Sequence, residues 1–343
     1  MELHFTRTNG LVDDAIDQLM AQVGDIAHPD IVREIILAGL KAGQENGGRA
    51  DLKLMNSSLK EMRFTAKVFG PYRDVRKVTV FGSARIKPDT QLYQMARDLG
   101  KKMAEAGFMV ITGGGPGIMQ AANEGAGPAH SFGVNIRLPF EQKPNPVLVG
   151  NPRYITYKYF FNRKVAFLKE ADAVMLFPGG FGTLDEAMES ITLLQTGKRY
   201  PLPLIFIDEP EGTYWERLCS FLENELSRLG YISRDDFRLI EQVTRPEDAV
   251  ARIHHFYSRY HSLRYVGEQL VIRMSTPLDQ GHVNTLKKDF AGILIPGGGM
   301  YLSGPFDDEM NEPELADLPR LVMDFNKRDF GRLRQLVDAI NDF

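Results

Sequence analysis

The sequence predicts an α/β protein built on a doubly wound parallel sheet, with a helical N-terminal extension and a mixed C-terminal extension. Two observations support this prediction. From about residue 78, short apolar runs alternate with amphipathic stretches of helical period, which is typical of parallel strands buried between helices. Three of the apolar runs also end in glycine-rich segments. In an open parallel sheet the carboxyl ends of the strands meet at one edge, where ligands bind.

The chain has 343 residues, enough for one large domain with extensions. Apolar residues recur at helical spacing between 10 and 70, interrupted by glycines at 43–48, so we expect a helical extension over 1–71, its third helix at 52–68. A Rossmann-like domain is expected over 72–262. The extension 263–343 has a weaker pattern. We expect strands at 266–273 and 292–295, a helical segment over 315–343, and packing on the core or on a partner subunit.

Each element of the central domain follows from the local pattern. The apolar runs predict strands, and the amphipathic stretches between them predict helices. Pro116 suits the first turn of a helix. The expected strands are 78–81, 108–112, 132–136, 173–177 and 204–207, and the expected helices are 91–106, the one after Pro116, 161–169, one from the loop at 178 to about 196, and 214–229.

Composition excludes several classes. With 43% apolar and 25% charged residues and a net charge of −4, the chain is typical of a globular protein and is no general nucleic-acid binder. The single cysteine, Cys219, excludes an internal disulfide and disfavours zinc, and we expect it to be a core residue. The seven histidines lack metal-ligand spacing. No apolar signal core or membrane-length run occurs, so we expect a cytoplasmic protein without a metal.

The most informative segment is 178–186, which follows the strand at 173–177 and opens a helix. Gly179, Gly180 and Gly182 allow a tight turn with bare N–H groups close to a ligand. The helix N-terminus adds partial positive charge at the same place. Thr183 and Glu186 lie beside this loop, and we expect Glu186 on the first turn of the helix. The segment therefore predicts an anion pocket with a carboxylate beside it.

Two further glycine-rich turns belong to the same expected edge: Gly82-Ser83 after the first strand, and the loop of Gly113, Gly114, Gly115, Gly117 and Met119 after the second. A dinucleotide fingerprint fails, because Ile118 stands where its third glycine would be, and no P-loop motif occurs. A phosphate on a smaller ligand is the better hypothesis. The late glycine run at 297–299 is interpreted as a loop.

Two charged positions have both a functional and an ordinary interpretation. Arg163 and Lys164 begin the helix before the strand at 173–177. They are either a solvated basic helix end or, given the forked geometry of arginine, part of an anion site. Glu186 is either an acid that favours a helix N-terminus for dipole reasons or a side chain of the pocket.

The segment 178–186 reads P-G-G-F-G-T-L-D-E. With the Arg163-Lys164 pair, the Gly113 loop and Gly82-Ser83, it resembles the family once labelled "possible lysine decarboxylase", which includes the LONELY GUY phosphoribohydrolases. The resemblance implies cleavage of the N-glycosidic bond of a nucleoside 5′-monophosphate, with Arg163 and Glu186 as catalytic pair and no cofactor. It also implies a homodimer or a higher homo-oligomer. No lysine stands out as a pyridoxal-phosphate ligand, so decarboxylation is rejected. The implied substrate-binding residues are Gly82, Ser83, Gly113, Gly114, Gly115, Gly117, Met119, Lys164, Gly179, Gly180, Gly182 and Thr183, with Asn135, Arg137 and Pro139 on the base side.

The chain departs from short members of that family by about 70 residues before the core and about 75 after it. This departure leaves open whether the substrate carries a cytokinin-type base or an ordinary purine or pyrimidine. The competing class is a non-catalytic binder or carrier of a nucleotide or of the molybdenum cofactor. A third interpretation is an assembly or regulatory protein with a vestigial site.

Overall fold

The computed structural model describes residues 7–45, 47–139, 143–309 and 312–343. It divides into two compact units, Met1–Phe64 and Thr65–Phe343. The first unit holds helices α1 (Leu11–Val23) and α2 (Pro29–Glu45) and most of α3 (Arg49–Phe69). These helices confirm the expected helical extension.

The centre of the second unit is a seven-stranded sheet in which every pair of neighbours is parallel. The strand order is β4-β3-β2-β1-β5-β6-β7. The chain therefore builds outward from β1 in one direction, returns, and builds outward from β5 in the other. The strands are β1 (Lys77–Phe81), β2 (Met109–Thr112), β3 (Ser131–Ile136), β4 (Tyr154–Tyr157), β5 (Ala173–Leu176), β6 (Leu204–Ile207) and β7 (Glu241–Val243).

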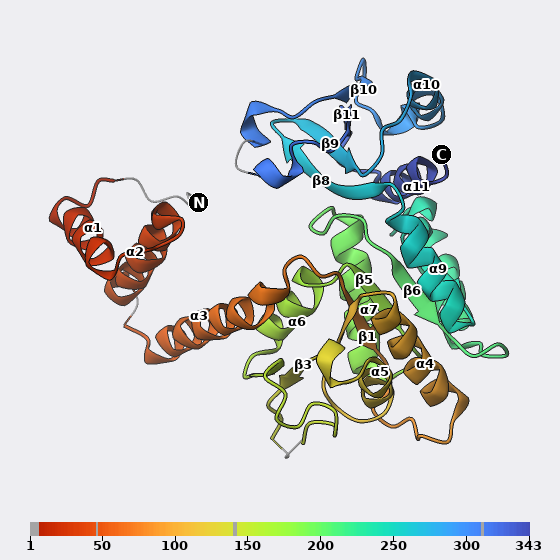
Figure 1. Ribbon diagram of the computed structural model, residues 1–343, viewed down its shortest axis with the longest axis horizontal. Coiled ribbons are helices and arrows are strands. Elements are labelled where there is room, and N and C mark those ends of the chain that lie inside the picture. The colour runs from red at the N-terminus through yellow and green to blue at the C-terminus, as the bar shows by residue number, and fades with distance from the viewer. Residues whose placement is uncertain (1–6, 46, 140–142, 310–311) are drawn as a thin grey trace. The chain divides into compact units, whose positions relative to one another are not determined.

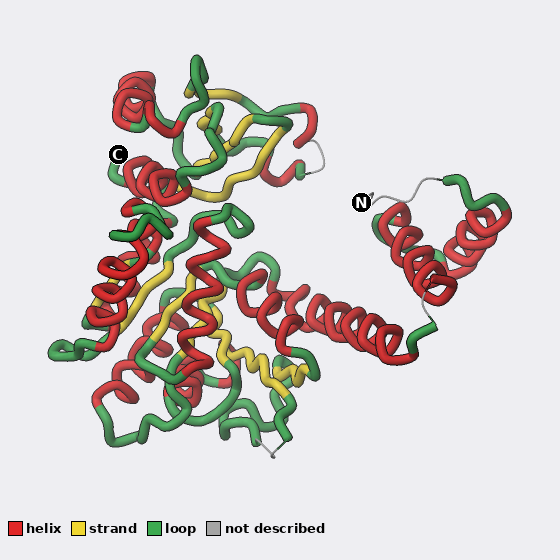
Figure 2. Tube along the Cα trace, turned by 180° about the vertical axis from the view of Figure 1, so that it is seen from behind, coloured by secondary structure: helices red, strands yellow, loops and turns green. Residues whose placement is uncertain are grey.

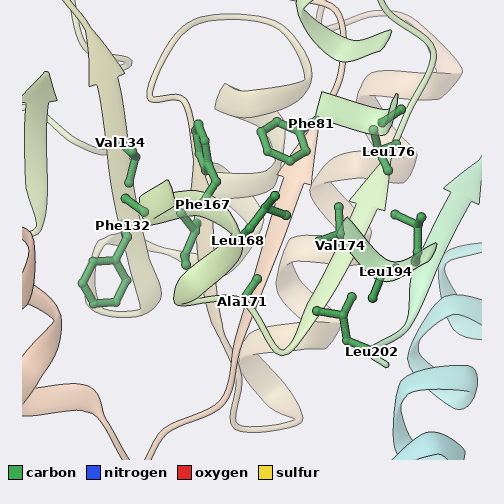
Figure 3. Close-up of a cluster of buried hydrophobic side chains, with 14 of the residues drawn as sticks. Phe81, Phe132, Val134, Phe167, Leu168, Ala171, Val174, Leu176, Leu194 and Leu202 are labelled. Carbon is green, nitrogen blue, oxygen red and sulfur yellow. The ribbon is translucent and has the colours of Figure 1, made fainter. Parts of the chain in front are cut away.

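Helices cover both faces of this sheet (Figure 1). The alternation of β5 shows how: Ala173 and Met175 point into the core under α4, α5 and α9, and Val174 and Leu176 into the core under α6 and α7. Figure 3 shows the second of these cores, with Phe81, Phe167 and Leu194 around β5. The helices are α4 (Gln91–Glu105), α5 (Ile118–Ala126), α6 (Phe160–Lys169), α7 (Phe181–Gln195), α8 (Tyr214–Phe221) and α9 (Pro246–Phe256).

The doubly wound sheet confirms the fold that the sequence predicts, and all five expected strands are present. Two strands at the sheet edges, β4 and β7, were not predicted. Only two of the four β4 residues are buried, and β7 has three residues, two of them polar. Their apolar patterns are therefore too short to stand out. The helix expected over 214–229 is also shorter, because a π-helical turn at Leu222–Ser227 follows α8.

The C-terminal part of the second unit forms a four-stranded antiparallel sheet of order β10-β11-β9-β8. Figure 2 shows it as a separate group of strands, with helices beside it. Apolar side chains of α10 and α11 share one core with this sheet. The elements are β8 (Tyr260–Val266), β9 (Gln269–Met274), α10 (Gln280–Asp289), β10 (Met300–Ser303), β11 (Arg320–Met323) and α11 (Phe330–Asn341).

One expectation for this region is confirmed in part and two are wrong. Most of the strand expected at 266–273 is present as β9, but it begins only at Gln269, because Gly267 takes a φ of +57° and lets β8 reverse into β9. Segment 292–295 makes one isolated bridge, Leu294 with Phe325, instead of a strand. The helix expected over 315–343 begins only at Phe330, since the fully buried run Arg320–Met323 is a strand between two others.

The C-terminal extension packs on the core of its own chain. The ring of Phe330 occupies the space beside Gly197, where an added Cβ would lie 2.0 Å from the ring. Arg334 donates hydrogen bonds to the Leu202 carbonyl at 3.3 Å and to Glu241 at 2.6 Å.

In the described part of the chain, no helix is both long and apolar enough to cross a membrane. Short 3-10 helices lie at Gly70–Tyr72, Pro128–His130, Arg234–Leu239, Ala291–Ile293, Asp307–Glu309 and Pro313–Leu315.

Candidate active site

A pocket of about 960 Å³ opens at the carboxyl ends of β1 and β5, where the chain reverses its direction of winding. This switch point is where open α/β sheets bind their ligands. The loop after β1 supplies Gly82 to Ile86, and the loop after β5 with the first turn of α7 supplies Pro178 to Leu184. The two loops touch through a hydrogen bond from the Ser83 N–H to the Pro178 carbonyl, 3.1 Å long. These two predicted glycine-rich turns therefore meet in one pocket, and the third contributes Gly113 and Met119 to its lining.

The glycines of the β5 loop are of two kinds. A Cβ at Gly179 would lie 2.1 Å from Thr183 Oγ1, so this glycine is required by the turn itself. A Cβ at Gly180 or Gly182 would meet nothing within 4 Å, although both residues line the pocket. Gly180 is the N-cap of α7, and no side chain caps that end. The uncapped N-terminus of α7 therefore faces the pocket without side chains in the way, as an anion site requires.

Glu186 lies on the second turn of α7, because the helix begins at Phe181. The expectation of a first-turn acid is therefore wrong, and the first turn carries no acidic residue at all. The interpretation of Glu186 as an acid that stabilises the helix N-terminus loses its basis, since that effect fades beyond the first turn. Glu186 is 3% exposed, yet it lines the pocket.

Arg163 faces Glu186 from α6, with Nη2 3.9 Å from Oε1. Its guanidinium lies over the rings of Phe160 and Phe167, 5.5 and 5.2 Å from their centroids. Among the described residues, neither Arg163 Nε nor Glu186 Oε2 has a hydrogen-bond partner, although both atoms are buried. Buried polar atoms in a native protein are nearly always paired. Two such atoms lie on the facing side chains Arg163 and Glu186, which both line this pocket.

The electrostatics of the pair reflect this incomplete pairing. Burial raises the pKa of Glu186 to about 7, against the opposing charges of Lys164 and Arg163. Burial likewise lowers the pKa of Arg163, against the carboxylates of Glu186 and Asp185. A carboxyl group that titrates near neutral pH is the type of group found at sites of acid–base and charge-stabilising chemistry.

Lys164 points away from the pocket, although the sequence analysis placed it in substrate binding. Its Nζ contacts Glu189, lies 2.8 Å from Asp185 Oδ2 and 3.6 Å from Glu186 Oε2, and it does not line the pocket. Neighbouring residues on a helix differ in direction by about 100°. Arg163 and Lys164 therefore serve two different surroundings.

Most glycines of the Gly113 loop pack against neighbouring segments instead of lining the pocket. Gly113 and Met119 line the pocket, but Gly114, Gly115 and Gly117 do not. A Cβ at Gly114 would lie 2.8 Å from the Tyr154 ring, and one at Gly117 would lie 2.3 Å from the Ser83 carbonyl oxygen. Both have positive φ, at +75° and +68°. These glycines permit a close approach between loops.

The residues expected on the base side lie outside the pocket lining. Asn135 is buried within β3, while Arg137 and Pro139 are exposed. Ile136 and Leu138 line the pocket instead. Side chains alternate between faces along an extended chain, so residues 136 and 138 share one direction and 135, 137 and 139 the other.

Several residues that line the pocket are not among the predicted site residues, and four of them are polar or aromatic side chains at its edge or turn: Arg85, Phe160, Phe181 and Tyr214. Tyr214 donates a hydrogen bond of 2.7 Å to the Gly179 carbonyl and fixes the turn. Arg85, Phe160 and Phe181 also line the pocket, and Phe181 is 92% exposed. Arg85, Phe181 and Tyr214 each lie a few residues after the end of a strand, and this position was the signal that could have identified them.

In the ranges that the structure describes, no group of three His, Cys, Asp or Glu side chains could hold a metal. Cys219 is half-buried beside the core, and burial raises its pKa.

The fold and the pocket define a doubly wound α/β protein with a pocket at its switch point. Residues 103–253 match the family model described as "Possible lysine decarboxylase". The cytokinin riboside 5′-monophosphate phosphoribohydrolase LOG of Oryza sativa subsp. japonica is 30% identical over 194 residues, which cover 54% of this chain and 75% of that protein. LOG7 of Arabidopsis thaliana, with the same enzyme name, is 27% identical over 187 residues, covering 53% and 82%. The chain belongs to this LONELY GUY (LOG) family.

Among solved structures, the molybdenum cofactor binding protein of Rippkaea orientalis matches at 20% identity with a TM-score of 0.37, covering 52% of this chain and 93% of that one. The molybdenum cofactor carrier protein of Chlamydomonas reinhardtii matches at 18% identity with a TM-score of 0.36, covering 52% and 96%.

Proposed function

We propose that the protein hydrolyses the N-glycosidic bond of a nucleoside 5′-monophosphate, releasing the free base and ribose 5-phosphate. The observation that carries the proposal is Glu186, a buried carboxylate whose Oε2 accepts no hydrogen bond among the described residues and which lines a pocket beside the uncapped N-terminus of α7. The names of the curated relatives support the same reaction class.

In this proposal the 5′-phosphate binds at the N-terminus of α7, where Gly180, Gly182 and Thr183 line the pocket. Helix N-termini bind phosphate through backbone N–H groups and the helix dipole. Binding energy at the phosphate, away from the bond that breaks, orients the ribose for reaction. Gly82, Ser83, Gly113 and Met119 line the same pocket.

Glu186 and Arg163 act at the sugar. Cleavage of a glycosidic bond builds positive charge on the ribose, and an ionised Glu186 stabilises that charge or attacks C1′. Arg163 orients the carboxylate and the substrate from the other side of the pocket. Phe160, Ile136 and Leu138 give the pocket an apolar wall suited to the base.

A screen of 5′-monophosphates against the matching nucleosides tests the proposal, with free base and ribose 5-phosphate both measured. We expect release from at least one monophosphate and at least a hundredfold preference over its nucleoside. Equal rates with the nucleoside would contradict the phosphate site. Tight retention of a nucleotide or of the molybdenum cofactor without turnover would favour the carrier instead.

A further inference from the structure

Lys164 of α6 lies among three acidic side chains of α7. Three carboxylates surround its ammonium: Asp185 at 2.8 Å, Glu186 at 3.6 Å, and Glu189 in direct contact. The Lys164 side chain is 17% exposed and lies outside the pocket lining. An ammonium has three donors and no acceptor, so the carboxylates of α7 are its natural partners.

The three acids lie within about one turn of the same helix, where like charges at such spacing repel one another. Asp185 and Glu189 therefore oppose the ionisation of Glu186, and Arg163 and Lys164 favour it. Burial acts to lower the pKa of Lys164, but pairing with Asp185 and Glu189 raises it. Lys164 thus stays charged through neutral pH, and in the described part of the chain it is the cation that forms an ion pair with Glu186 Oε2.

We propose that Lys164 is a positioning residue that links α6 to the acidic side of α7 and keeps the Glu186 carboxylate charged, without contact to the substrate. The role in catalysis rests on the proposed hydrolysis. The role in the charge state of Glu186 does not, since it is measurable without substrate.

The proposal makes Arg163 and Lys164 functionally different. Arg163 faces the pocket, with Nε unpartnered, and contacts the substrate in the proposed reaction. Lys164 acts only through Glu186. Had Lys164 bound the phosphate, its loss would weaken substrate binding at every pH. Because it acts through ionisation of Glu186, its loss matters most where that carboxyl group is partly protonated.

The test compares Lys164→Met and Lys164→Arg with the control Lys169→Met, which removes an exposed lysine of α6 paired with Glu170. Removing an opposite charge at this distance raises a carboxyl pKa by about one unit or more. From a starting value of about 7, a one-unit rise lowers the ionised fraction of Glu186 at pH 7 about fivefold. We expect kcat/KM of Lys164→Met to fall about fivefold at pH 7 and to recover to within about twofold at pH 9. Lys164→Arg should restore most of the activity.

A second readout follows the titration of Glu186 by carbon NMR of labelled glutamate without substrate, with Glu186→Gln assigning the signal. We expect an upward shift in Lys164→Met and no shift in Lys169→Met. An unchanged titration would overturn the proposal, as would a deficit in kcat/KM that is equal at all pH values. Should the wild-type protein hydrolyse no monophosphate, the proposed function fails while the NMR titration still decides the positioning role. If Lys164→Met does not fold, Lys164→Gln serves in both measurements.

Discussion

The protein contains two glutamates of equal burial and opposite character. Glu186 and Glu309 are each 3% exposed. Glu309 accepts hydrogen bonds from Arg273, Arg320 and the Phe306 N–H, at 2.6 to 3.0 Å. Glu186 has Arg163 at 3.9 Å and Lys164 at 3.6 Å, and its Oε2 has no hydrogen-bond partner among the described residues.

The pKa directions follow this difference. Although burial acts to raise it, hydrogen bonds from Phe306, Arg273 and Arg320 lower the pKa of Glu309 to about 2. For Glu186 burial prevails, and the pKa rises to about 7. The exposed fraction of a side chain therefore does not distinguish a structural carboxylate from a reactive one. Its depth in the protein and the hydrogen bonds that it accepts together set its pKa.

The largest effect is expected for Glu309→Ala. This change leaves the guanidinium groups of Arg273 and Arg320 buried without their shared carboxylate. Breaking a buried ion pair from one side costs about 3–5 kcal/mol, and urea unfolding should show a loss of this size. Glu312→Ala removes a more exposed partner of the same Arg273 and should cost less. Equal losses of unfolding free energy in the two variants would contradict the structural role assigned to Glu309.

Glu186→Gln should lower activity without lowering stability, the reverse of what we expect for Glu309→Ala. In the proposed reaction kcat/KM falls about 10²–10³-fold, equivalent to about 3–4 kcal/mol of transition-state stabilisation. The free energy of unfolding should not fall, because the native carboxylate is desolvated without full compensation. Near-wild-type turnover of the substrate found in the screen would refute the proposed role of Glu186.

The pH dependence separates the two glutamates further. Ionised Glu186 is required, so kcat/KM should rise about tenfold per pH unit toward an apparent pKa of about 7. Because its folded pKa is raised, Glu186 adds stability below its unfolded value of 4.5, and that contribution disappears as the pH rises through about 7.

Glu309 has a lowered folded pKa, so its stabilisation is present above 4.5 and disappears as the pH falls toward about 2. Activity profiles and urea unfolding between pH 2 and 9 measure both effects. A pH–rate profile of the wild-type protein that is flat across pH 5.5–8 would count against an essential Glu186.

The smallest effect concerns Gly182, where an added Cβ meets no protein atom within 4 Å. Gly182→Ala should leave stability unchanged or raise it by up to about 1 kcal/mol, because alanine favours the helix. It should nevertheless raise KM for the phosphorylated substrate severalfold by narrowing the proposed phosphate site. Gly117→Ala is the matched contrast. Its Cβ would lie 2.3 Å from the Ser83 carbonyl oxygen at a positive φ, so it should destabilise the fold.

The central sheet could be predicted from the sequence because its inner strands are buried on both faces and read as apolar runs, as in Leu204–Ile207. The edge strands and β11 could not, since their runs are short or resemble those of a helix. The motif at 178–186 located one wall of the pocket. The direction of Lys164 and the alternation at 135–139 depend on where α6 begins and on how β3 ends, which local patterns do not specify. Tyr214 reaches the Gly179 carbonyl only because the sheet places its loop beside the β5 loop.

The ring of Phe330 against Gly197 has a consequence for how this chain can vary. Gly197 follows the C-terminal end of α7, two residues after Gln195, so the C-terminal extension supports the far end of the helix that bears Glu186. A larger residue at 197 and the aromatic ring at 330 cannot coexist in this arrangement. We expect the two positions to change together among long relatives. Position 197 should carry a side chain only in relatives where position 330 is no longer aromatic.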